Sequence, residues 1–146
     1  HLGALRPAVS VFTWPVRVYW EDTDAGGIVF YANYLKFFER ARTEWLRHLG
    51  VEQQRLREDT GGMFVVSGTE LRYHRPARLD DVLQVSARLT ELGRASMTLQ
   101  QEAWRMRDGQ PDALLCEGTI RIGWVDAAQM RPGRIPASII DVLTHL

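Results

Sequence analysis

The chain has 146 residues, a length that suits one domain and would leave two domains undersized. Hydrophobic residues make up 45% of it and charged residues 25%, which excludes a disordered or fibrous chain. Lys plus Arg and Asp plus Glu number 18 each, so the formal net charge is zero and argues against nucleic acid or an anionic membrane as partner.

Three further features bear on location. A single cysteine cannot form a disulfide within the chain, so we expect a reducing, cytoplasmic compartment. No run approaches the roughly 20 apolar residues that span a bilayer, so we expect no integral membrane segment. Residues 1–10 lack the layout of a signal peptide, and we treat them as a disordered or extraneous terminal segment outside the fold.

The first half of the chain predicts one strand and one long helix. Residues 11–22 alternate apolar and polar side chains, as a strand does, and Pro15 favours an edge position. Residues 22–27 have the composition of a turn. From about residue 30 to 49, apolar side chains recur every three or four positions, which predicts a long helix. Residues 53–58 predict a further turn or two of helix.

The second half predicts four more strands and a terminal turn of helix at residues 138–146. The strands span residues 63–74, 81–91, 95–107 and 114–125. Because the long helix is apolar over more than half its girth, we expect a five-stranded antiparallel sheet to wrap around it in an α+β fold. The predicted domain covers residues 11–130, and residues 131–146 form a C-terminal tail.

The turn before the long helix is the main candidate for chemistry. Asp24 lies just ahead of the helix, where unpaired N–H groups and the helix dipole favour an ionised carboxylate that can act as base or nucleophile. The same N–H groups can stabilise an oxyanion. Gly26 and Gly27 let the backbone pass close to a ligand. The alternative is that Asp24 only caps the helix or fills an Asx turn.

Other residues carry weaker signals. Arg78 and Arg94 lie beside turns, where each either binds an anionic group or is simply solvated. Glu39 either reaches a pocket or pairs with Arg42 one turn along the helix. The histidines do not pair with a cysteine or a carboxylate at metal-ligand spacing, so we expect no metal site. Cys116 lies on the apolar face of its predicted strand, so we expect a buried core thiol rather than a nucleophile.

Residues 17–35, RVYWEDTDAGGIVFYANYL, resemble the signature of the 4-hydroxybenzoyl-CoA thioesterase family of hotdog-fold proteins. Residues 38–47 (FERARTEWLR), 75–81 (RPARLDD) and 91–96 (ELGRAS) resemble its Tol-Pal-associated acyl-CoA thioesterase branch. The similarity extends from about residue 16 to 127. Tyr31 departs from that branch, which commonly has His at this position, and is closer to the aryl-CoA enzymes.

The resemblance implies a β-α-β-β-β-β hotdog fold and hydrolysis of acyl- or aroyl-CoA to free acid and CoA, without a metal or redox cofactor. Asp24 would attack the thioester carbonyl or activate the attacking water, and the backbone N–H of Tyr31 would polarise the thioester oxygen. Glu39 would face the acyl group, and Arg94 would meet the CoA phosphates. Arg78 is our own weaker addition to the phosphate site.

The family also implies a homodimer or homotetramer with active sites at the dimer interface. Two other functions stay open. One is a non-catalytic hotdog module that binds acyl-CoA or acyl carrier protein, and the intact Asp24 and glycines favour the enzyme over it. The other is a hotdog dehydratase, which would need a His base, and no histidine lies near Asp24 in the sequence.

Overall fold

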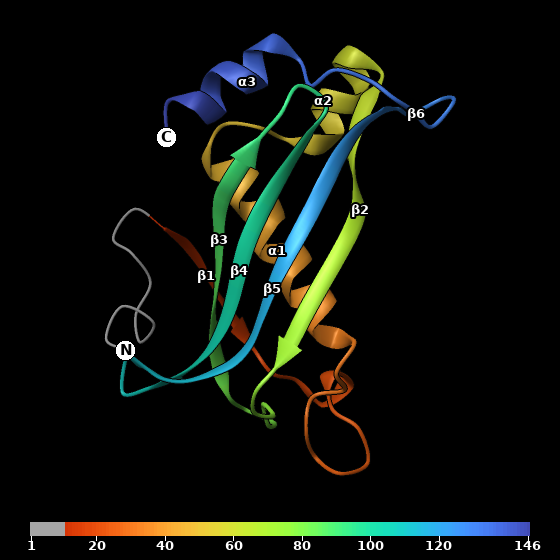
Figure 1. Cartoon of the computed structure of the whole chain (residues 1–146). Coiled ribbons are helices and arrows are strands. Elements are labelled where there is room, and N and C mark those ends of the chain that lie inside the picture. The colour runs from red at the N-terminus through yellow and green to blue at the C-terminus, as the bar shows by residue number, and fades with distance from the viewer. Residues whose placement is uncertain (1–10) are drawn as a thin grey trace.

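A curled antiparallel sheet wraps around one long helix in the computed structural model, which describes residues 11–146 (Figure 1). The prediction for residues 1–10 lies outside these residues. The helices are α1 (Asn33–His48), α2 (Gln53–Thr60) and α3 (Ala137–Thr144), and a 3-10 turn covers Trp20–Asp22. The strands are β1 (Phe12–Arg17), β2 (Gly62–Tyr73), β3 (Val82–Leu92), β4 (Ser96–Arg107), β5 (Gln110–Asp126) and β6 (Arg131–Pro132).

The sheet has the order β1-β3-β4-β5-β2, with β6 paired to β5, and every pairing is antiparallel. The predicted α+β fold with strand order β-α-β-β-β-β is therefore confirmed. Pro15 lies in β1, an edge strand, opposite Gln84, as its missing N–H predicts. The two-residue strand β6 was not predicted.

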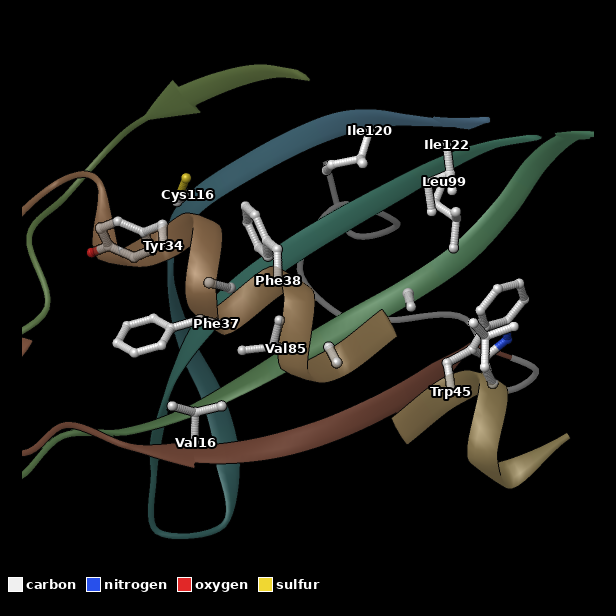
Figure 2. Close-up of a cluster of buried hydrophobic side chains, with 14 of the residues drawn as sticks. Val16, Tyr34, Phe37, Phe38, Trp45, Val85, Leu99, Cys116, Ile120 and Ile122 are labelled. Carbon is white, nitrogen blue, oxygen red and sulfur yellow. The ribbon is translucent and has the colours of Figure 1, made fainter. Parts of the chain in front are cut away.

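The core lies between α1 and the concave face of the sheet (Figure 2). Phe37, Phe38, Ala41 and Trp45 follow the predicted helical spacing and are buried against strand residues such as Val85. Each large apolar side chain buried in this way contributes roughly 2 kcal/mol. After residue 130 the chain rejoins this core, where Ile135, Ile139 and Leu143 are buried.

Cys116 belongs to the same core, as predicted. It is fully buried on β5. Burial, together with the neighbouring Glu117 carboxylate, raises the pKa of the Cys116 thiol to about 12. The thiol is therefore neutral at physiological pH and packs as a small apolar group.

The first predicted strand is too long. β1 ends at Arg17, which pairs with Val82 at the beginning of β3. Of residues 18–22, only Val18 continues the main-chain hydrogen bonds, with the loop residues Asp80 and Asp81 that precede β3. Instead the Asp22 carboxylate accepts a hydrogen bond of 2.8 Å from the Tyr19 N–H and the chain turns. Trp20, predicted to share the apolar face, is 77% exposed.

Two other boundaries differ from prediction. β5 begins at Gln110, and its alternation breaks where Cys116 pairs with Ala103 but Leu114 pairs with Trp104. Leu115 is thus an extra, fully buried residue in a β-bulge, which simple alternation cannot reveal. The long helix starts at residue 33 rather than 30, because the preceding residues form the turn described next.

Candidate active site

A tight turn holds Asp24 ahead of α1. The Asp24 N–H donates to the Ile28 carbonyl (2.8 Å), and the Gly27 N–H donates to the Asp24 carbonyl (3.0 Å). Gly27 has φ of 79°, a left-handed conformation that favours glycine. The Gly26 N–H donates to Asp24 Oδ1 at 2.8 Å. This is the bond of an Asx turn, the structural role that the sequence offered as the alternative to catalysis. Oδ2 accepts no hydrogen bond from residues 11–146, so this oxygen is free to react.

The turn is fastened to the helix through the buried main-chain carbonyl of Asp22. This oxygen accepts a hydrogen bond from Asn33 Nδ2 (2.8 Å) and another from the Phe30 N–H (3.0 Å). Asp22 and Asn33 are both buried. One hydrogen-bonded unit therefore joins the segment that carries Asp24 to the first turn of α1. Sequence reasoning missed Asn33, although an asparagine in the first turn of a helix was a usable signal.

The N-terminus of α1 offers the predicted oxyanion donor. Asn33 N–H donates to the Phe30 carbonyl and Tyr34 N–H to the Tyr31 carbonyl. The Tyr31 N–H itself meets no acceptor within the part of the chain that the structure describes. It is therefore free to bind an oxygen atom of a ligand, with the positive end of the helix dipole behind it.

Aromatic side chains surround this N-terminus. The Tyr31 ring is 62% exposed and lies 5.9 Å from the Tyr73 ring, centroid to centroid. The buried Tyr34 hydroxyl accepts a hydrogen bond of 3.1 Å from the Ala77 N–H, and burial raises the pKa of Tyr34 to about 12. This bond pins the loop between β2 and β3 against α1.

The pinned loop brings Arg78 beside the Asp24 turn. The Val29 N–H donates to the Ala77 carbonyl at 2.8 Å, and Ile28 forms a bridge with Arg78. Five predicted site residues therefore lie at one end of the sheet. They are Asp24, Gly26, Gly27, Tyr31 and Arg78.

The other two predicted site residues lie elsewhere in the single chain. Arg94 is in the turn between β3 and β4, at the far end of the 11-residue strand β3 and so about 35 Å from the Arg78 end (Figure 1). Glu39 lies on α1 eight residues after Tyr31, a separation of about 12 Å at the rise of an α-helix. Glu39 does not form an ion pair with Arg42, which instead donates to Gln101 Oε1 at 2.9 Å.

Asp24 is exposed in the single chain, so any closed reaction site needs a covering group. Within residues 11–146, no group of three or more His, Cys, Asp or Glu side chains is arranged to hold a metal ion. Among the helices described, none combines the length and apolarity needed to cross a bilayer.

Known proteins identify the family. The family model described as the Thioesterase-like superfamily matches residues 18–143. This chain belongs to that family. The acyl-CoA thioester hydrolase YbgC of Escherichia coli O157:H7 is 41% identical over 131 residues, covering 90% of this chain and 94% of the relative. The acyl-CoA thioesterase YbgC of Haemophilus influenzae is 41% identical over 135 residues, covering 92% and 96%.

Solved structures agree with this assignment. A probable thioesterase from Bartonella henselae has a TM-score of 0.76 at 30% identity, covering 87% of this chain and 100% of that one. A 4-hydroxybenzoyl CoA thioesterase variant in complex with 4-hydroxybenzoyl CoA has a TM-score of 0.83 at 20% identity, covering 90% and 97%, and shares the fold. The predicted hotdog thioesterase family is confirmed.

Proposed function

We propose that this thioesterase hydrolyses acyl- or aroyl-CoA, with Asp24 as the reacting carboxylate and the Tyr31 N–H as the oxyanion donor. The observation that carries this proposal is the unit built on the Asp22 carbonyl. It holds a carboxylate with one free oxygen and an N–H without a protein acceptor at the same end of α1. The YbgC relatives support the thioester as the bond that is cleaved.

The chemistry requires only this carboxylate, this N–H group and water. On one route Asp24 Oδ2 attacks the carbonyl carbon, the C–S bond breaks, CoA leaves as a thiolate that takes a proton, and water hydrolyses the resulting anhydride. On the other route Asp24 removes a proton from water, the resulting hydroxide attacks the carbonyl carbon and the C–S bond breaks. Asp24 then passes that proton to the departing CoA sulfur. On either route the Tyr31 N–H donates to the oxyanion, a contact worth about 3 kcal/mol in comparable enzymes.

We propose that a second copy of the chain closes the site. β2 is an edge strand, with a free side to which no other strand pairs in residues 11–146. Its side chains are largely exposed, including Val66 (49%) and Tyr73 (45%). Antiparallel pairing of β2 with β2 of a partner would continue the sheet and cover these apolar side chains. A homodimer or a homotetramer built from it follows.

This dimer would also complete the CoA site. Ser96, two residues after Arg94, pairs with Gly123 of β5. Gly62, the first residue of β2, pairs with Asp126 of the same strand β5. The turn that carries Arg94 therefore lies at the Gly62 end of the sheet. Antiparallel pairing sets the Gly62 end of the partner against the Tyr73 end of this chain. Arg94 of the partner subunit and Arg78 of this chain would then bind CoA phosphates from two sides.

We place the enzyme in the cytoplasm, where acyl-CoA is made and a lone buried thiol such as Cys116 stays reduced. Acyl carrier protein, which presents its acyl group on a similar thiol, is the second carrier that we propose.

The experiment is hydrolysis of butyryl-, hexanoyl-, palmitoyl- and benzoyl-CoA by the full chain, followed as release of free CoA thiol. Gel filtration on the same sample measures the oligomeric state. We expect a dimer or tetramer that turns over at least one thioester. A monomer, or an oligomer that binds these thioesters without releasing CoA, contradicts the proposal and favours a binding module.

A further inference from the structure

A cleft of about 150 Å³ lies along α1 between the helix and the edge strand β2, beyond the Asp24 turn. Its apolar walls include Phe64 of β2 and Ile122 of β5. From α1, three polar side chains line it: Glu39, Arg42 and Thr43. Apolar walls with a few convergent polar groups are the lining of a small-molecule site, and a cleft of this size has room for one end of such a ligand.

Arg42 is anchored at this cleft and keeps donors to spare. Its Nη1 donates to Gln101 Oε1 at 2.9 Å, and the fully buried Gln101 amide is fixed in turn, because its Nε2 donates to the carbonyls of Phe38 and Ser86 at 3.0 Å. A guanidinium has five N–H groups, and no second hydrogen bond from Arg42 occurs in residues 11–146. Burial lowers the pKa of Arg42, while the charge of Glu39 opposes that shift.

Glu39 supplies an acceptor beside this donor. One of its carboxylate oxygens accepts a long hydrogen bond of 3.4 Å from Thr43 Oγ1, and no ion pair within 4.0 Å joins Glu39 to Arg42 among the described residues. The pair carries no net charge. An aliphatic hydroxyl both accepts and donates, so it satisfies both side chains. A carboxylate would be repelled by Glu39, and a methyl group would give no partner to the spare donors of Arg42 or to the free carboxylate oxygen of Glu39.

The position along α1 sets the length of the ligand. Glu39 and Arg42 follow Tyr31 by eight and eleven residues, or about 12 and 16 Å of helix axis. Long helical side chains lean toward the helix N-terminus, which shortens the gap to the Tyr31 N–H. An acyl chain of about six carbons, with its thioester at that N–H, suits the remaining distance.

We propose that this cleft selects acyl groups of about six carbons that carry a hydroxyl at the far end. Arg42 donates to the hydroxyl oxygen and Glu39 accepts its proton. This inference rests on the proposed thioester hydrolysis and adds Arg42 as a residue that determines substrate specificity.

The test compares kcat/KM for three thioesters of equal length: 6-hydroxyhexanoyl-CoA, hexanoyl-CoA and adipoyl-CoA. The wild-type enzyme should prefer the hydroxylated chain over the plain one by about tenfold, with adipoyl-CoA the poorest. Arg42→Met and Glu39→Gln should each reduce that preference to within about threefold. Because both rates come from one sample, their ratio does not depend on how much of a variant is folded.

Arg40→Met is the matched control. Arg40 is exposed on the same helix and lies over the Phe37 ring at 6.0 Å, away from the cleft, so its loss should leave the preference intact. Equal rates on hydroxylated and plain chains overturn the inference, and a preference for adipoyl-CoA shows that the cleft binds an anion instead.

If no thioester in the set is cleaved, the proposed hydrolysis is wrong, but the inference about the cleft is still open to test. Equilibrium binding of the same three thioesters by calorimetry then decides the inference about the cleft. Tighter binding of 6-hydroxyhexanoyl-CoA, lost in Arg42→Met, supports it, and equal binding of all three overturns it.

Discussion

Asn33→Ala should reduce catalysis by much more than it reduces stability. The Asn33 amide supplies one of the two hydrogen bonds that fasten the Asp22 carbonyl to α1. Because the Phe30 N–H still satisfies that oxygen in the variant, the buried acceptor is not orphaned. The expected loss of unfolding free energy is therefore only about 1–2 kcal/mol, from one hydrogen bond and a little packing.

The effect on catalysis should be larger. Asp24 lies two residues after Asp22, so a looser carbonyl anchor lets the carboxylate drift relative to the Tyr31 N–H. A displacement of about 1 Å costs roughly 100-fold in favourable cases, so we expect kcat to fall by at least about tenfold while KM changes little. Steady-state hydrolysis of hexanoyl-CoA and urea denaturation of the same preparation measure the two quantities.

Ser86→Ala is the matched control. The buried Ser86 Oγ accepts one hydrogen bond of 3.0 Å from the Glu102 N–H in the middle of the sheet, far from the Asp24 turn. The loss of this hydrogen bond should lower the free energy of unfolding by an amount similar to that in Asn33→Ala, and it should leave kcat near the wild-type value. If Asn33→Ala keeps kcat within about twofold of wild type, or if Ser86→Ala loses as much activity, the positioning argument is refuted.

Three further predictions concern the site and the core. Tyr31→Phe should keep kcat within about threefold, because the backbone rather than the phenol is the donor, and a loss above tenfold in a kinetic assay refutes this. When Asp24→Asn subunits and Arg94→Ala subunits are mixed and allowed to reassociate, about one quarter of wild-type activity should return. Half of the dimers then contain one subunit of each kind, and each of these dimers keeps one of its two sites intact. A site formed within one chain would give no recovery. Stability to urea should fall above about pH 9, because unfolding lets Cys116 and then Tyr34 ionise at their ordinary pKa values, and a flat profile to pH 11 contradicts it.

Local periodicity accounts for the parts of the fold that were predicted. The apolar spacing of α1 reflects burial of one helix face, and Pro15 marks an edge strand because it lacks an N–H. Both signals act within a few residues of chain. The early end of β1 and the bulge at Leu115 depend on strand partners far away in sequence, so alternation alone could not show them.

The candidate site was predicted in part for the same reason. Asp24, Gly26 and Gly27 form one short turn whose hydrogen bonds are local. The anchoring role of Asn33 depends on a bond across eleven residues. In the proposed dimer, the place of Arg94 would depend on a second subunit. Contacts between distant segments and between chains leave no short-range pattern.

Replacement of one carboxylate oxygen tests the central claim most directly. Asp24→Asn keeps an oxygen that can accept the Gly26 N–H and removes the negative charge, so the turn should fold unchanged. Asp59→Asn, an exposed change on α2, is the control. We expect kcat on the best CoA thioester to fall by at least about 100-fold in Asp24→Asn and to stay normal in Asp59→Asn. A folded, dimeric Asp24→Asn enzyme that hydrolyses this thioester at the wild-type rate would contradict the account.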